Sequence, residues 1–439
     1  MLNGVTEASG AMLDPAEIAA LLAPVAAEEK LALGVSGGND SLGLMLLVHD
    51  WCRQLGRVPE IHVFSVDHGL RAEAADECAR VAAIAWRLGF QHQTLVWEGD
   101  KPVSGIQAAA RAARYRLMGR AMEKHGIGVL LVAHHRQDQA ETLLMRLAHG
   151  SGPDGLCGMG QWSEVAGTRI FRPLLNVDPA QLRERVAAAG LAGVIDPSNG
   201  DRAFERVRWR SMLAELAPMG LDGERLGRFG QRMARVRDTL DFYSGELFAQ
   251  IVTLDHFGVA RVALPAFLRL PDEMQIRVLG RMLVRVTGGR SRLSLAGLER
   301  LAEAIAACGS ESRFARTVGG AQVVFYRGFL LVHAEPGRGE LRDSVLQGPG
   351  EMLWDQRFAV RNRGQDRIVI SPDYPVSRRL FERLAGEGFA APMGALKRVP
   401  RLLDADGQLV GIGGHVLRDG LECRFAPTAR GDGSGPWAP

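Results

Sequence analysis

Between Lys30 and about Leu175, short apolar runs alternate with longer segments of helical periodicity. We expect strands at 31–35, 61–66, 94–97 and 129–133, each followed by a helix, at 42–55, 73–88, 105–124 and 137–148. Continuous apolar strands are typical of parallel sheets, because helices bury both of their faces. The alternation therefore predicts an open α/β domain with a parallel sheet covered on both sides.

The chain has 439 residues, too many for one ordinary core, so two or three domains are expected. The α/β pattern assigns residues 1–215 to a first domain. Arg-rich helical segments assign 216–317 to a second. Beyond 318 the periodicity changes toward two, which predicts a small mixed α+β domain over 318–430. The Gly/Pro/Ser-rich residues 431–439 are expected to be disordered.

Composition excludes several classes of protein. The five cysteines lie far apart without a C-x-x-C pair, which argues against a zinc site, an iron–sulfur cluster or a disulfide framework. No apolar run approaches the ~20 residues that span a bilayer, and no secretory signal is apparent. We therefore expect a cytoplasmic protein without a membrane partner. The net charge of +3 does not by itself indicate a nucleic-acid partner.

Polar residues follow three of the expected strands. The three segments are Ser36–Ser41, Asp67–Arg71 and His134–Asp138. Ligands of open α/β sheets bind beyond the carboxyl ends of the strands, so these segments are expected to meet at one edge.

The segment Ser36-Gly37-Gly38-Asn39-Asp40-Ser41 is a candidate phosphate-binding loop. Paired glycines let the backbone approach an anion, and the following helix directs free N–H groups toward it. Asp40 would repel a bare phosphate, which suggests a magnesium ion. The alternative is a helix cap after a glycine turn. The segment matches neither the Walker loop nor the dinucleotide fingerprint.

An SGGxDS loop after a first strand resembles that of the N-type ATP pyrophosphatases, the PP-loop superfamily. This resemblance implies a Rossmann-like adenine-nucleotide α-hydrolase sheet and cleavage of ATP to AMP and pyrophosphate. Together with the loop, five further stretches resemble the tRNA(Ile)-lysidine synthetase family over roughly residues 30–215. They lie at 66–71, 105–115, 133–142, 150–156 and 172–175.

That family joins the ε-amine of free L-lysine to carbon 2 of the wobble cytidine in a CAU-anticodon isoleucine tRNA. ATP first adenylates the base oxygen with release of pyrophosphate, and lysine then displaces AMP. The resemblance implies that the loop, with Asp67 and His68, binds ATP and Mg²⁺, and Asp40 is the candidate ligand of the metal.

Lysine must attack as the free amine although its ordinary pKa is about 10.4, so a proton acceptor is needed. His134, His135 and Asp138 are candidates for that base, or for holding the amine or the metal; Asp138 lies one helical turn from His134. The alternative is that the two histidines only cap the next helix. Glu141 could orient another side chain.

Candidate phosphate or tRNA contacts are Arg111 and Arg114, three residues apart on one expected helix, with a solvated face as the alternative. The family's Arg-Asn-x-x-Arg element follows a turn that here reads 196–199. Arg206 and Arg210 match its arginines, but Val207 replaces the asparagine.

Two further arginine stripes could contact RNA or merely face water. They comprise Arg225, Arg228, Arg232 and Arg235, and Arg277, Arg281 and Arg285. The segment 397–403 weakly resembles the family's C-terminal domain, which grips the tRNA acceptor end.

Two other functions compete with this assignment. A PP-loop tRNA thiolation enzyme would need cysteines near 107–111, and none is present there. A nucleotide-binding regulator would need the loop but not the His-His-Asp cluster. The sequence leaves the oligomeric state open, with a homodimer among the options.

Overall fold

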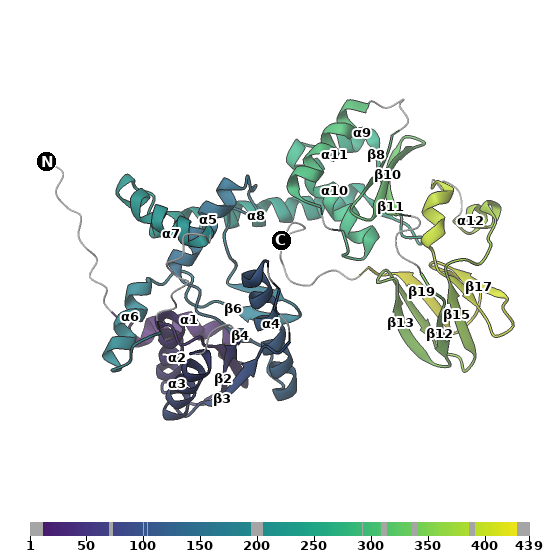
Figure 1. Cartoon of the computed structure of the whole chain (residues 1–439). Coiled ribbons are helices and arrows are strands. Elements are labelled where there is room, and N and C mark those ends of the chain that lie inside the picture. Colours follow the sequence, from purple (N-terminus) through teal and green to yellow (C-terminus); the bar gives the residue numbers. More distant parts are fainter. Residues whose placement is uncertain are drawn as a thin grey trace. The chain divides into compact units, whose positions relative to one another are not determined.

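A computed structural model describes residues 12–69, 73–99, 101–102, 104–194, 205–291, 293–308, 314–335, 341–385 and 391–427. The chain forms two compact units, Met1–Arg235 and Val236–Pro439. Each is described by itself below (Figure 1).

The N-terminal unit is built on one six-stranded sheet with strand order β3-β2-β1-β4-β6-β5. Its strands are β1 (Lys30–Gly34), β2 (Glu60–Asp67), β3 (Gln91–Val96), β4 (Leu130–Leu131), β5 (Trp162–Val165) and β6 (Thr168–Phe171). All pairings are parallel except the β5–β6 hairpin. The predicted parallel α/β sheet is therefore confirmed. The hairpin was not predicted, because its two strands are only four residues long and mix polar with apolar residues without a regular pattern.

Helices cover both faces of this sheet (Figure 1). They are α1 (Pro15–Leu22), α2 (Asn39–Cys52), α3 (Ala74–Arg87), α4 (Ile106–His125), α5 (Arg136–Ala148) and α6 (Pro179–Ala188). The next helix, α7 (Glu205–Leu216), packs on α5. Leu31 and Leu33 of β1 face the core under α1, α2, α3 and α6, whereas Ala32 faces the core under α4. Both faces of β1 are thus buried, which explains its unbroken apolar run.

The Arg-rich sequence over 206–249 is compatible with one continuous helix, but it forms two helices. A 3₁₀ turn at Ala217–Met219 follows α7, Gly220 is left-handed with φ 92°, and α8 spans Gly223–Ile251. Pro218 lacks the amide that would continue α7, and Gly220 accepts a φ that a branched residue would resist. The break lets α7 pack on α5 through Leu213, Leu143 and Leu144.

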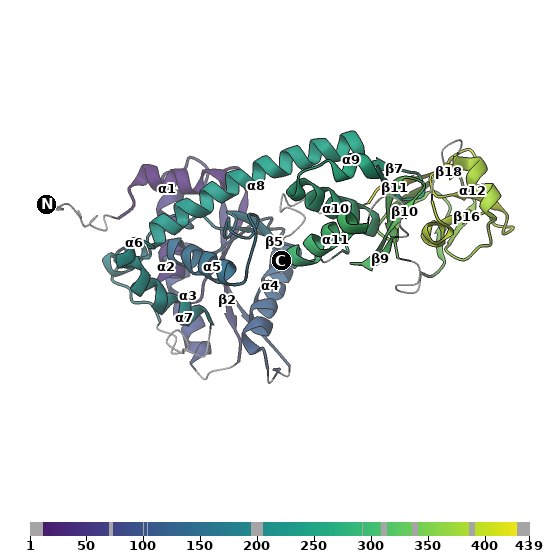
Figure 2. The same cartoon turned by 90° about the horizontal axis from the view of Figure 1, so that it is seen from above.

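In the C-terminal unit, one sheet has the order β7-β8-β11-β10-β9. Its strands are β7 (Thr253–Leu254), β8 (Ala260–Ala263), β9 (Ala315–Val318), β10 (Ala321–Tyr326) and β11 (Phe329–Ala334). The helices α9 (Leu264–Leu268), α10 (Asp272–Thr287) and α11 (Leu295–Cys308) share a core with it (Figure 2). The expected domain boundary at 317/318 falls inside β9, because strands from both sides of it form this sheet.

Two further antiparallel sheets complete this unit, with orders β12-β15-β16-β17-β18 and β13-β14-β19. Their elements are β12 (Ser344–Gln347), β13 (Gly350–Trp354), β14 (Phe358–Asn362), β15 (Arg367–Ser371), α12 (Arg378–Ala385), β16 (Arg401–Leu403), β17 (Leu409–Ile412), β18 (His415–Val416) and β19 (Leu421–Phe425). The expected tail at 431–439 lies outside the described residues. In the described part of the chain, no helix combines the length and the apolar content needed to cross a membrane.

Candidate active site

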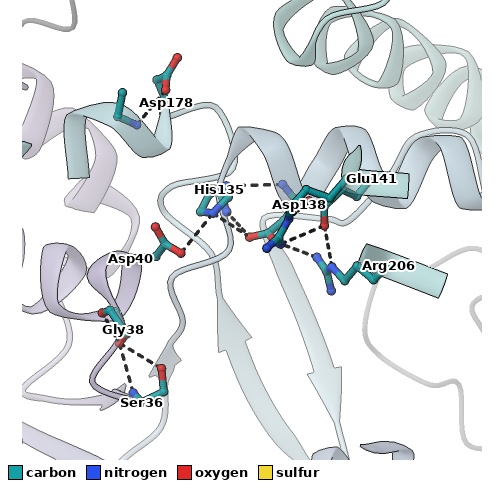
Figure 3. Close-up of polar contacts among 11 residues, drawn as sticks. Ser36, Gly38, Asp40, His135, Asp138, Glu141, Asp178 and Arg206 are labelled. Carbon is teal, nitrogen blue, oxygen red and sulfur yellow. Dashed lines mark hydrogen bonds and ion pairs between the residues drawn. The ribbon is translucent and has the colours of Figure 1, made fainter. Parts of the chain in front are cut away.

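The loop after β1 folds around its own serine hydroxyls (Figure 3). The backbone N–H of Ser36 donates to Oγ of Ser41 at 3.2 Å, and that hydroxyl donates to the carbonyl of Gly38 at 3.0 Å. Gly37 is left-handed with φ 86°, which places Gly38 as the N-cap of α2 without any side-chain cap. The first N–H groups of α2 therefore lack a side-chain cap and are available to an anion.

A second backbone segment lies against this loop. The N–H of Val194 donates to the carbonyl of Gly37 at 2.9 Å, and the N–H of Gly193 donates to Oδ1 of Asn39 at 3.0 Å. A Cβ at position 193 would approach the Asn39 nitrogen to 2.4 Å, so only glycine fits there. Asn39 thus fastens the loop to this segment.

His135 is the N-cap of α5 and is 5% exposed. Its Nδ1 accepts from the N–H of Asp138 at 3.4 Å, and its own N–H donates to Oδ2 of Asp138 at 3.0 Å. Its Nε2 lies 3.4 Å from Oδ2 of Asp40 (Figure 3). Burial alone would lower the pKa of His135, but the carboxylates of Asp40, Asp138 and Glu141 outweigh burial and raise it. His135 therefore caps α5, as the helix-cap alternative predicts, and also joins α5 to the loop; its part in catalysis stays a prediction.

Asp138 and Glu141 of α5 hold the two matched arginines of α7. Arg206 donates through Nε to Glu141 Oε2 and through Nη2 to Asp138 Oδ1, both at 2.8 Å. Arg210 donates through Nε to Glu141 Oε1 at 2.7 Å. Burial would raise the pKa of Asp138, but His135, Arg206 and His134 hold it below its ordinary value. This half of the site is a balanced network of acids and bases.

His134 contacts a different arginine. Nε of Arg172, which follows β6, donates to Nδ1 of His134 at 3.3 Å. Burial lowers the pKa of His134 to about 3, with Arg172, Arg111 and Arg206 acting in the same direction and Asp138 against them. His134 is therefore neutral at physiological pH.

A similar pair lies at the end of β2. Nη2 of Arg114 is 3.3 Å from Nε2 of His68, whose other ring nitrogen, Nδ1, is buried with no hydrogen-bond partner in the described residues. Burial and Arg114 lower the pKa of His68 to about 4. Asp67 accepts the N–H of Gly69 at 2.8 Å and so shapes the turn beside them. Leu70 and Arg71, the rest of this motif, lie outside the described residues.

Guanidinium groups without a carboxylate partner gather on the α4 side of the site. Arg111 lies over the ring of Tyr115, 5.2 Å from its centroid. The charge of Arg111 lowers the pKa of Arg114 and of Arg172, after burial in each case. In the described residues, no ion pair joins Arg111, Arg114 or Arg172 to an acid, so this half is suited to a polyanion.

Sequence reasoning did not single out Arg172 or Arg146 as individual residues. Arg146 of α5 donates to the carbonyls of Gly155 and Gly158 at 2.8 and 2.7 Å, and Gln139 exchanges hydrogen bonds with Met159. These contacts hold the Gly-rich loop 150–160 on α5. Arg172 lies within one of the family motifs, but only its contact with His134 shows that it belongs to the site.

The C-terminal arginines expected near RNA differ from that expectation. Arg401 is 7% exposed and donates to the carbonyls of Pro372 and Val399, each at 2.6 Å. Arg398 is also buried and pairs with Asp355 at 3.2 Å. Both guanidinium groups thus bind partners within the fold, whereas Lys397 is exposed. The turn at 196–199 lies outside the described residues.

A magnesium ion was expected at Asp40, whose side chain is 45% exposed beside the loop. Among the described residues, no group of three or more His, Cys, Asp or Glu side chains could hold a metal. Mg²⁺ usually keeps waters and binds one or two carboxylates together with phosphates, so a lone exposed carboxylate beside a phosphate loop fits it.

Comparison with known proteins finds relatives of this chain. A model of the PP-loop domain family, ATP_bind_3, matches residues 13–217. The tRNA(Ile)-lysidine synthase of Rhodopseudomonas palustris is 42% identical over 333 residues, which are 73% of this chain and 95% of that protein. That of Bradyrhizobium diazoefficiens is 41% identical over 291 residues, 65% of this chain and 80% of that protein. The solved U34-tRNA thiolase NcsA from Methanococcus maripaludis matches with a TM-score of 0.43 at 15% identity, covering 50% of this chain and 77% of that one.

Proposed function

The chain belongs to the tRNA(Ile)-lysidine synthase family of PP-loop ligases, and we propose that its N-terminal unit performs both steps of lysidine formation with the residues described above. In the first step, O2 of the wobble cytidine attacks the α-phosphorus of ATP and pyrophosphate leaves. In the second, the lysine ε-nitrogen attacks carbon 2, the C–O bond breaks and AMP leaves. Free lysine starts as an ammonium group and the product nitrogen keeps one hydrogen, so two protons leave it overall, one before the attack and one after it.

The loop and the unpaired arginines are suited to the first step. Free N–H groups at the start of α2 receive phosphate oxygens, and Arg111 and Arg114 stabilise the charge that grows as pyrophosphate leaves. In the described residues these arginines contact no carboxylate, so their charge is available for a triphosphate. This separation of unpaired guanidiniums from the balanced carboxylate network is the observation that carries the proposal.

Asp138 is the group we assign to the lysine amine. Its side chain is 13% exposed, and its ionised form is favoured by His135 and Arg206, so it attracts an ammonium group. Glu141 is wholly buried and both of its oxygens accept from arginines, so it positions Arg206 and Arg210 instead. The tRNA-contacting role of those two arginines stays a prediction.

Mg²⁺ is proposed as the metal of the first step, held by Asp40. When bound, it would neutralise phosphate charge. His135 contacts the same carboxylate and would keep it directed toward the loop. An isoleucine tRNA with a CAU anticodon, free L-lysine, the cytoplasmic location and a homodimer are likewise proposals.

Labelled lysine tests the function directly. Enzyme, ATP, Mg²⁺ and an isoleucine tRNA transcript with a CAU anticodon should incorporate the label into tRNA, with one AMP released per lysine. A transcript whose wobble cytidine is changed to uridine is the matched control and should stay unlabelled. Label that enters only from a sulfur donor would assign the chain to thiolation instead.

A further inference from the structure

Arg172 is 5% exposed and fully engaged on one side of its guanidinium group. Nη1 donates to the carbonyl of Gly160 at 2.9 Å and to Oγ of Ser163 at 2.8 Å, which ties the group to the β5 hairpin. Nε donates to His134 Nδ1 at 3.3 Å. The arginine is therefore anchored from the protein side and directed at the imidazole.

This contact determines the tautomer of His134. A guanidinium group has only donors, so the nitrogen that it contacts must offer a lone pair. Nδ1 is therefore unprotonated, and in a neutral imidazole the single proton is on Nε2. Protonating Nδ1 would place two N–H groups face to face beside a buried cation.

We propose that Arg172 is a positioning residue that fixes His134 as a neutral imidazole with its proton on Nε2, so that His134 donates a hydrogen bond in the adenylation step and does not accept the lysine proton. The inference deepens the proposed function and rests on it. Nε2 is the ring nitrogen that remains for a substrate. A donor held at a phosphoryl oxygen contributes about 10²–10³-fold in rate.

The charges around His134 come from several elements. Arg111 on α4, Arg172 after β6 and Arg206 on α7 oppose a cationic imidazole, whereas Asp138 on its own helix favours one. The neutral form is thus retained although a carboxylate is near. Without Arg172, both the fixed tautomer and part of this opposition would be lost.

Nitrogen-15 NMR of the whole chain labelled at histidine reads the tautomer independently of activity. The His134 signal, assigned by its loss in His134→Gln, should show a proton on Nε2 and no titration between pH 5 and 8. In Arg172→Met the tautomers should mix, and titration should move to a higher pH than in wild type, although burial and the other arginines still lower the pKa of His134. Arg146→Met is the matched control, because Arg146 is also bound to loop carbonyls but contacts no histidine; it should leave the His134 signal unchanged.

Kinetics provide a second test if Arg172→Met fails to fold. Gln can place an amide N–H near the position of Nε2, whereas Asn cannot reach it. Adenylation should fall by less than about 10-fold in His134→Gln and by about 100-fold in His134→Asn. Adenylated tRNA should accumulate in neither variant.

Three results would overturn the proposal: a wild-type His134 protonated on Nδ1, a wild-type His134 that titrates near pH 6.5, or adenylated tRNA that accumulates in both His134 variants. If wild-type enzyme neither adenylates tRNA nor incorporates lysine, the proposed function fails, while the NMR result still decides the tautomer.

Discussion

Nε of Arg210 donates a 2.7 Å hydrogen bond to Oε1 of Glu141, a carboxylate with no exposed surface. The same carboxylate accepts from Arg206 at 2.8 Å, so one buried acid attaches α7 to α5. Glu141→Gln should lower the free energy of unfolding by about 2–3 kcal/mol, less than the ~3–5 kcal/mol of a fully buried pair because both arginines are partly exposed. Urea denaturation measures this.

The matched control for that change is Glu224→Gln, which removes the exposed Glu224–Arg228 pair on α8. It should cost less than about 0.5 kcal/mol. Equal losses in the two variants would mean that Glu141 does not fasten α7.

Asp40→Asn and Ser36→Ala should each lower ATP-dependent adenylation by about 100-fold or more while the fold persists. Asp40 is the proposed metal ligand, and Ser36 bonds the hydroxyl of Ser41 inside the loop. ATP–pyrophosphate exchange in the presence of tRNA measures the step, and circular dichroism checks the fold. Asp222→Asn, an exposed change before α8, is the control. A folded Asp40→Asn enzyme with full exchange activity would remove Asp40 from the site.

Asp138→Asn should slow the lysine step more than adenylation, since an amide neither attracts an ammonium group nor takes its proton. Acid-quenched reactions should then contain adenylated tRNA. With a less basic amine in place of lysine, the rates of the second step in the variant and in wild type should differ less. Loss of the adenylate instead would assign Asp138 to ATP or metal binding.

The arginine stripe of α8 should contribute unequally to tRNA affinity. Arg225 and Arg228 pair with Asp222 and Glu224, whereas no ion pair of Arg232 is found in the described part of the chain. Arg232→Gln should therefore lower the salt slope of tRNA binding by roughly 0.7–0.9, and Arg228→Gln by less. Filter binding between about 50 and 200 mM salt measures the slopes. Unchanged slopes in both would place the stripe on a solvated face.

Stability should depend on pH through His134. Its folded pKa of about 3 lies below the ordinary value of 6.5, so the unfolded chain binds more protons between these values. The neutral imidazole of His134 therefore contributes to the free energy of unfolding in full above pH 6.5. This contribution is lost as the pH falls toward 3, at up to about 1.4 kcal/mol per pH unit. Urea denaturation at several pH values between 5 and 6 measures this. The free energy of unfolding of His134→Gln should change less with pH than that of wild type.

Apolar patterning was enough to predict the parallel sheet, because β1 carries an apolar run and β1 and β2 are both buried along their central residues. It did not reveal the β5–β6 hairpin, whose four-residue strands have neither an unbroken apolar run nor a regular alternation. The end of α7 was missed because a single Pro and Gly outweigh an otherwise helical pattern. Apolar patterning along the chain therefore predicts strands that are buried on both faces of the sheet.

The motifs predicted which side chains meet at one edge of the sheet, but they did not predict which of these side chains pair with one another. That Glu141 holds Arg206 and Arg210 depends on a packing of α7 against α5 across more than 60 residues of sequence. The donor at His134 depends on Arg172, 38 residues away. No spacing rule along the chain encodes such contacts, since the tertiary fold creates them.

The bonds of Gly193 and Val194 to the phosphate loop carry a consequence for biosynthesis. Asn39 leaves the ribosome long before its partner at residue 193, 154 positions later, is made. At about 5–20 residues per second, the loop waits roughly 8–30 s for the backbone that fastens it. A nascent chain stalled before that point has the strand, the glycines and the serines of the loop, but lacks the segment that holds Asn39.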